Sequence, residues 1–423
     1  MQIHIRELVE AGVIDEAAAD KIQAFYDAKK AGSSNKIFVI FGLLGAIMVG
    51  LGILLLVAHN WDEYTRATKS FFAFLPILTG QVACAFTVWK KYDTVAWREG
   101  SSVFLFFALG AGIALISQIY HIDGDESSFV LTWISLAFPL FYIMKASVTS
   151  VLFLAGNAYF GFLTGYETKP ELSHYMFWVF LVAAFPFYFH LIKSAKNSLF
   201  TYLHHWAFVL SVVINLGTLA HEEGYWLIVV YMALFGLLLL VGNMNRLREL
   251  PVLANAYRFV GWAGSLVLLY VVSFESLWSG ELSREYTSVS FYHCGEFYMS
   301  AVLIAGLLVG MFVKGMRNYK NPVHWAALLL LVLFIVQSGP FLATLTINFF
   351  ILWLGLYIII NSLKENHLAG LNLGLGIIGI LIFCRFFDTN IPFIVKGLLF
   401  LVMGAGFFVA NYYMVKNRKK DEK

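Results

Sequence analysis

The sequence predicts an all-α integral membrane protein, a polytopic bundle of about 14 transmembrane helices with a short N-terminal cytoplasmic helical hairpin. Three observations lead to this fold class. Hydrophobic residues make up 60% of the 423-residue chain and charged residues only 13%, whereas soluble globular chains carry about 25% charged residues. Apolar runs long enough to cross a bilayer recur along the chain. Basic residues collect in alternate loops between these runs. This composition excludes a soluble enzyme, a disordered chain and a nucleic-acid binder.

Residues 1–36 precede the first apolar run and carry charges of both signs. They are therefore not a signal peptide, whose apolar region lies within it. Gly12 is expected to separate two short amphipathic helices, and Asp15 is expected to cap the second. We predict that this hairpin packs against a partner protein or a second copy of the chain; a sensory or catalytic role is the alternative.

Residues 37–415 form the predicted transmembrane domain. A spanning helix needs about 20 mainly apolar residues, because no backbone amide can stay unpaired in lipid. The runs that meet this criterion are Ile37–Val57, Phe71–Trp89, Val103–Ile119, Phe129–Met144, Val148–Tyr166, Met176–Ile192, Leu199–Leu219, Tyr225–Val241, Tyr257–Phe274, Phe297–Val313, Val323–Val336, Leu345–Ile360, Leu368–Phe387 and Ile391–Val415. Residues 416–423 form a basic cytoplasmic tail.

The basic residues predict the orientation of the chain in the membrane. With a cytoplasmic N-terminus, 23 of the 29 Lys and Arg residues fall in inner segments. This asymmetry is what the positive-inside rule requires, and it favours an even number of spans with both termini in the cytoplasm. The outer loops contain only Arg66, Lys69, Lys169, Arg284 and Arg385, and Lys396 lies within the last span.

Small residues at a spacing of four indicate where helices pack closely. Gly370 and Gly374 follow this spacing in the run Leu368–Phe387, and Gly110 and Gly112 place small residues in an earlier run. Such residues let two helix backbones approach each other. We predict packing seams at these positions.

Two motifs at the ends of the first and third runs resemble a known family. They are Ala58-His59-Asn60-Trp61-Asp62 and the segment from Ser117 to Asp125, and the spacing of Leu8, Gly12 and Ile14 and the later Arg385-Phe386-Phe387-Asp388 add to the likeness. The chain resembles the bacterial predicted membrane proteins of domain of unknown function 2157, most strongly over its first 150 residues. The resemblance implies a multi-pass protein of the bacterial inner membrane, and it implies no catalytic residues.

The charges that break the topology pattern are the candidate functional residues. A cation inside a span is costly unless it reaches the interface or meets a carboxylate. Lys396 therefore either extends to the outer interface or pairs with Asp388 or Asp62, and Arg385 faces the same choice. If Lys69, Arg385 and Lys396 point into the bundle, they form an outward-facing site for a phosphate or carboxylate. The predicted substrate-binding residues are Asp62, Lys69, Gln118, Arg385, Asp388 and Lys396.

His121, Asp123 and Asp125 supply an imidazole and two carboxylates within one short outer loop. These are ligands for a divalent cation, so the loop is a candidate metal site. An ordinary solvated Asp-Gly turn is the alternative. His204 and His205 are expected to pack at a helix end. Phosphate-binding Gly-rich loops and zinc-protease motifs do not occur in the sequence, and no cofactor is predicted.

These patterns favour a transporter or flippase-like protein for a small anionic or lipid-linked substrate. They predict a cavity near the bilayer midplane lined by Gln118, Arg385 and Lys396. One alternative is a membrane-embedded transferase for polyprenyl-phosphate-linked substrates, with Asp62 and Glu63 supplying the base at the outer face. A second is a membrane scaffold that binds partners through residues 1–36.

Overall fold

The computed structural model describes most of the chain as helix. The described residues are 12–13, 15–22, 61–166, 175–195, 197–219, 224–244, 247–279, 295–313, 321–365, 367–386 and parts of 392–408. Within them no strand occurs, as the all-α prediction requires. The chain forms two compact units, the first made of residues 1–75 and 115–122, the second of residues 76–114 and 123–423.

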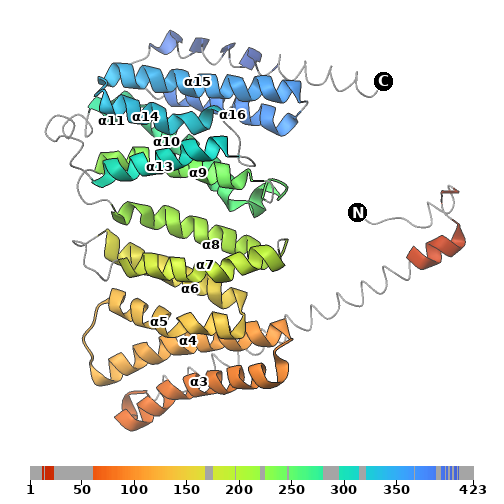
Figure 1. Ribbon diagram of the computed structural model, residues 1–423, viewed down its shortest axis with the longest axis vertical. Helices are drawn as coiled ribbons and strands as arrows, with labels where there is room; N and C mark the ends of the chain where they lie inside the picture. Colours follow the sequence, from red (N-terminus) through yellow and green to blue (C-terminus); the bar gives the residue numbers. More distant parts are fainter. Residues whose placement is uncertain are drawn as a thin grey trace. The chain divides into compact units, whose positions relative to one another are not determined.

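The described helices follow one another along the chain (Figure 1). Up to residue 242 they are η1 (Trp61–Glu63), α3 (Arg66–Phe86), the π-helix η2 (Thr87–Lys91), α4 (Val95–Tyr120), α5 (Glu126–Met144), α6 (Ser147–Gly165), α7 (Met176–Ser194), α8 (Leu199–Asn215), η4 (Leu216–Leu219), η5 (Gly224–Trp226) and α9 (Leu227–Gly242). Beyond it they are η6 (Val252–Ala254), α10 (Ala256–Val272), α11 (Glu275–Ser279), α13 (Gly295–Phe312), η8 (Pro322–Trp325), α14 (Ala326–Ile335), α15 (Pro340–Lys364) and α16 (Leu368–Phe386).

Nine helices in the described part of the chain are long and apolar enough to cross a membrane. Three more apolar helices are shorter, at Leu227–Gly242, Ala256–Val272 and Pro322–Ile335. Twelve of the 14 predicted runs therefore coincide with a helix. The run Ile37–Val57 lies outside the described residues and Ile391–Val415 only partly within them, so the count of 14 stays a prediction.

Only part of the predicted N-terminal hairpin lies among the described residues. Gly12 has a positive φ of 67°, a conformation that glycine adopts without strain. Asp15 Oδ1 accepts a hydrogen bond of 2.8 Å from Ala18 N at the start of the helical residues 16–22. This is the N-cap that the sequence predicts.

Polar side chains tie helix ends together in the second unit. Asn255, fully buried, caps α10 by accepting from Arg258 N, and its Nδ2 donates to Gly242 O and Leu247 O. Glu99 on α4 accepts 2.7 and 2.8 Å hydrogen bonds from Ser147 N and Val148 N, the first amides of α6. Except for Leu247 O, which lies in a turn, the backbone groups bound here belong to helix ends and have no partner within their own helix.

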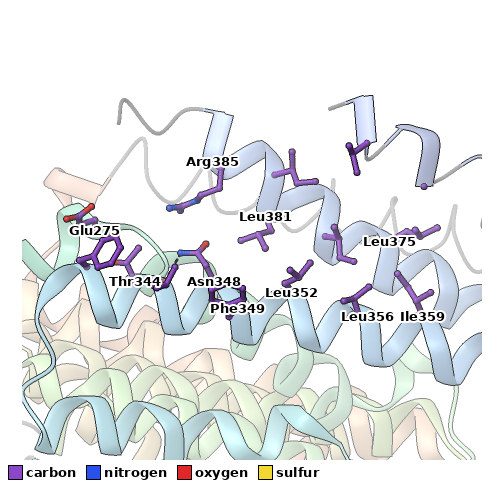
Figure 2. Close-up of a pocket in the computed structure, with 16 residues that line it drawn as sticks. Glu275, Thr344, Asn348, Phe349, Leu352, Leu356, Ile359, Leu375, Leu381 and Arg385 are labelled. Atoms are coloured by element: carbon purple, nitrogen blue, oxygen red, sulfur yellow. Dashed lines mark hydrogen bonds between the residues drawn. The ribbon is translucent and has the colours of Figure 1, made fainter. Parts of the chain in front are cut away.

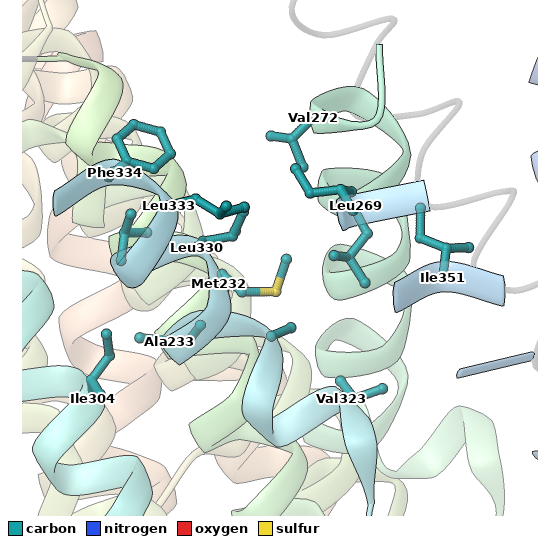
Figure 3. Packing of buried hydrophobic residues seen from close by; sticks show 14 of the residues in the cluster. Met232, Ala233, Leu269, Val272, Ile304, Val323, Leu330, Leu333, Phe334 and Ile351 are labelled. Carbon is teal, nitrogen blue, oxygen red and sulfur yellow. The ribbon is translucent and has the colours of Figure 1, made fainter. Parts of the chain in front are cut away.

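Helix α9 lies at the centre of the largest buried apolar cluster (Figure 3). Eleven of its 16 residues are buried, and it packs against α10, α13 and α14. Met232 and Ala233 contribute to this cluster together with Leu269 of α10 and Leu330 of α14. A helix that is buried on all sides needs apolar residues on all sides. The apolar sequence of α9 is therefore explained by its burial inside the protein, without contact with a bilayer.

The predicted glycine seam lies between α15 and α16, which run side by side (Figure 1). A Cβ atom on Gly374 would lie 2.9 Å from the Gly355 carbonyl oxygen and 3.0 Å from Ile359 N. Both neighbours are backbone atoms of α15, so neither moves without displacing the helix. The close approach of the two helices therefore depends on glycine at 374.

Gly374→Ala is expected to destabilise the protein by about 1–3 kcal/mol, because the added methyl group overpacks the α15–α16 seam. Gly376→Ala is the matched control, since a Cβ atom there meets no atom within 4 Å. It is expected to leave stability unchanged or raise it by up to about 1 kcal/mol through helix propensity. Unfolding by titration with a denaturing detergent measures both variants. Equal stability of the two would contradict the seam.

Candidate functional site

The predicted substrate-binding residues are divided between the two units. Asp62, Lys69 and Gln118 belong to the first unit and Arg385 to the second. Asp388 and Lys396 lie outside the described residues. The predicted convergence of the basic residues on one cavity therefore stays a prediction.

Lys69 lies in the first turn of α3, where an aromatic side chain holds it. Its Nζ atom is 5.7 Å from the centroid of the Trp61 ring. The next residue, Ser70, makes a 3.1 Å hydrogen bond to the hydroxyl group of Tyr120 at the end of α4. Asp62 is exposed in η1, and Gln118 is exposed on α4. Within the first unit, Lys69 thus points to an aromatic ring near the helix end.

The described residues contain no group of three His, Cys, Asp or Glu side chains placed to hold a metal ion. His121 ends α4 with a positive φ of 51°, and Asp125 is the N-cap of α5. Hydrogen bonds from the Ser127 hydroxyl (2.5 Å) and Ser128 N (3.2 Å) lower the pKa of Asp125 to about 2. Asp125 therefore acts as a helix cap, in keeping with the turn alternative.

Two asparagine side chains inside the helices connect neighbouring helices. Asn157 Nδ2 donates to Phe177 O of α7, and Asn215 Nδ2 donates to Ala158 O of α6. His204 Nδ1 bonds Phe200 O, one turn earlier on α8, and its ring is fully buried. These contacts are interhelical and intrahelical packing contacts, as expected for polar groups in membrane helices.

A cavity of about 700 Å³ lies along α15 and α16. Its lining is mostly apolar and polar at one end (Figure 2). The lining residues are Glu275, Phe341, Thr344, Leu345, Asn348, Phe349, Leu352, Leu356, Ile359, Leu375, Ile378, Leu381, Ile382, Arg385, Val402 and Gly406. Gln118 is not among them. Of the cavity residues that the sequence predicts, the structure places Arg385 here.

Arg385 is held at the polar end by the C-terminal end of α10. Its Nη2 atom donates a 3.1 Å hydrogen bond to Ser273 Oγ. Its Cζ atom lies 4.5 Å from the centroid of the Phe274 ring. A neutral hydroxyl and the π face of a ring thus orient the guanidinium group at the polar end of the cavity.

Asn348 of α15 completes the polar end. Its Nδ2 atom donates to Ser273 O at 3.1 Å and to Thr344 O at 2.7 Å. Asn348 Oδ1 and Thr344 Oγ1 are buried, and no residue in the described part of the chain donates a hydrogen bond to Asn348 Oδ1. A buried polar atom without a hydrogen-bond partner raises the free energy of the folded chain. Glu275, the first residue of α11, adds a carboxylate to the same end (Figure 2).

Glu275, Thr344 and the apolar wall were not predicted from the sequence as site residues. A signal is present in α15, where the cavity residues recur three or four positions apart. The positions are Phe341, Thr344, Leu345, Asn348, Phe349, Leu352, Leu356 and Ile359. This spacing places them on one face of a helix, and the face changes from polar to apolar along its length.

A second cavity of about 540 Å³ lies among α7, α8, α9 and α10. Tyr188 and Tyr257 contribute its hydroxyl groups. The Tyr188 hydroxyl lies 2.5 Å from His205 Nδ1 and 2.5 Å from the Tyr257 hydroxyl. These polar groups satisfy one another, so the second cavity presents an apolar wall without a free charge.

The nine long apolar helices of the described chain place the protein in the class of multi-pass membrane proteins. Residues 6–150 match the model of a family described as Predicted membrane protein (DUF2157). The match confirms the resemblance predicted over this part of the sequence. It ends within α6 and does not reach α15 or α16. No curated protein and no solved structure matches the chain.

Asp125→Ala is expected to make stability less dependent on pH. The folded-state pKa of about 2 is below the unfolded value of about 3.9, so the charged cap stabilises the fold above about pH 4, and this contribution is lost as the pH falls toward about 2. The variant should therefore melt below the wild type at neutral pH, and the gap should close in acid. Thermal melts of both proteins across this range measure the difference.

Asp123→Ala, in the same loop, is the control for Asp125→Ala and should follow the wild-type curve at all pH values. An Asp125→Ala gap that stays constant from neutral pH to about pH 2 would show that the ionised carboxylate does not stabilise α5.

Proposed function

We propose that this protein is a transporter-like membrane protein that binds an anionic amphiphile in the cavity between α15 and α16. The observation that carries the proposal is the position of Arg385 beside Thr344 and Asn348 at the polar end of a mostly apolar cavity, an end that also holds Glu275 (Figure 2). A ligand with an acidic head and an apolar tail matches this division. Its negative charge would contact the guanidinium group, and its tail would contact the apolar wall.

The size of the cavity supports a ligand with a chain. About 700 Å³ falls within the range of roughly 300–1,000 Å³ that is usual for small-molecule sites. The lining residues of α15 extend from Phe341 to Ile359, which spans about 27 Å at the rise of an α-helix. This length is close to the hydrocarbon thickness of about 30 Å of a bilayer. A tail inside the cavity therefore runs along the membrane normal, as a lipid chain does.

The electrostatics of Arg385 favour an anion at this site. An arginine near the hydrocarbon region is costly and is kept where it serves a ligand or a partner. Ser273 and Phe274 orient the guanidinium group toward the polar end. The five N–H donors of arginine form two parallel hydrogen bonds with a phosphate or carboxylate. Ser273 Oγ accepts a hydrogen bond from one of these donors, Nη2.

Arg385→Gln is expected to weaken binding of dodecyl phosphate by about 10–100-fold, because a hydrogen bond to a charged group contributes about 1.5–3 kcal/mol. Arg385→Lys should bind with intermediate affinity, since it keeps the charge without the planar pair of donors. Lys364→Gln, at the far end of α15, is the matched control and should bind as the wild type does. Equilibrium dialysis of the purified full chain with radiolabelled dodecyl phosphate measures these affinities.

Transport is tested separately with proteoliposomes. The wild type is expected to move a fluorescent acidic amphiphile between leaflets faster than liposomes without protein, and Arg385→Gln should remove most of this increase. A tail-side variant, Leu352→Trp, should block binding while leaving the head-group residues in place. Wild-type affinity in both Arg385→Gln and Leu352→Trp, or no movement above that of empty liposomes, would contradict the proposal.

A further inference from the structure

A second group of cations lies at the predicted inner face of the membrane, where the end of η2, the start of α4 and the end of α5 meet. Tyr92 is at its centre, in the turn between η2 and α4. The Tyr92 hydroxyl donates a 3.1 Å hydrogen bond to Ile143 O in the last turn of α5. This bond connects residues 51 positions apart and anchors the hydroxyl end of the ring at α5.

Two basic side chains lie over this one ring. Arg98 Cζ is 5.6 Å and Lys145 Nζ 5.5 Å from the centroid of Tyr92. Each contact is within the range of a cation–π interaction. Two like charges near one ring repel each other, so the arrangement is most stable when an anion lies between them.

The acidic residues nearby do not supply that anion. Both carboxylate oxygens of Glu99 accept hydrogen bonds from Ser147 N and Val148 N of α6. Asp93 is exposed. Arg98 Nε is buried and has no acceptor among the described residues. The site therefore has two cations and a buried donor without an acceptor among the described residues, and the carboxylate of the adjacent residue Glu99 is engaged by α6.

We propose that Tyr92, Arg98 and Lys145 bind the phosphate of an anionic phospholipid in the inner leaflet. Two exposed tryptophans, Trp89 and Trp97, flank the group, and Lys90 Nζ lies 4.3 Å from the ring centroid of Trp89. Tryptophans at helix ends mark the level of the lipid head groups. The phosphate of a lipid thus lies at the same depth as Arg98 and Lys145, and its chains lie along the exposed apolar side chains Phe86 and Val88.

The proposal does not depend on the cavity between α15 and α16. The two sites share no residue, and the ligand here is a lipid of the surrounding bilayer. Arg98 and Lys145 each add attraction to an anionic head group, and the expected effect of one such charge is about a fivefold change in affinity.

The test uses the full chain in nanodiscs or detergent, with native mass spectrometry to measure binding of phosphatidylglycerol and of phosphatidylcholine. Arg98→Gln and Lys145→Gln are each expected to weaken binding of phosphatidylglycerol about fivefold, and the double variant about 25-fold. Arg98→Lys and Lys145→Arg should keep most of the affinity, which separates loss of charge from misfolding. Phosphatidylcholine should bind weakly to all of them.

Lys193→Gln is the matched control, because Lys193 Nζ lies 4.3 Å from a single ring, Phe189, on the same predicted face. It should bind phosphatidylglycerol as the wild type does. An equal loss in Lys193→Gln and Lys145→Gln would show general surface attraction and overturn the site. Wild-type affinity in the double variant would also overturn it. Displacement of phosphatidylglycerol by an equal concentration of inorganic phosphate would show a site for free phosphate and overturn the lipid assignment.

Discussion

The need to pair every backbone amide in the absence of water governs this structure. A helix satisfies its own interior, so what remains are its ends, where four N–H and four C=O groups have no partner. In the described chain, several of these ends are closed by side chains from a neighbouring element. Glu99 of α4 closes the start of α6, and Asn255 connects the ends of α9 and α10. These contacts set which helices are neighbours, and hence where cavities form.

Inside the bundle the same constraint acts on side chains. Asn157, Asn215 and Asn348 each donate to a main-chain carbonyl of another element. At Asn157 and Asn215 the partner carbonyls belong to α6 and α7, and the bonds hold a packed core. At Asn348 the partner is Ser273 O, and the same serine's hydroxyl receives Arg385 Nη2. The contact that fixes α15 against the end of α10 thus also positions the guanidinium group at the cavity.

Much of the helical architecture could be predicted from the sequence, and less of the site. Apolar runs mark the helices because the bilayer and the core both select apolar residues. The run Leu345–Ile360, however, underestimates α15, which extends from Pro340 to Lys364. The added C-terminal turn is mainly polar, whereas the added N-terminal residues Phe341–Ala343 are apolar and continue the same helix. Arg385 stands out as a charge at a predicted outer helix end, yet its contacts Ser273 and Phe274 lie more than 110 positions away. The packing of α15 against both α16 and α10 brings them together.

In the described residues, acidic and basic side chains contact different kinds of group. The carboxylates of Glu99 and Asp125 accept hydrogen bonds from backbone amides at helix N-termini, where the amides carry partial positive charge. Cations are held on aromatic rings, as Arg98, Lys145 and Arg385 show. A ring attracts a cation without neutralising it, whereas a carboxylate would cancel its field. At Arg98 and Lys145 this pairing with a ring keeps two cations close together, and it is on these two side chains that the proposed lipid phosphate site depends.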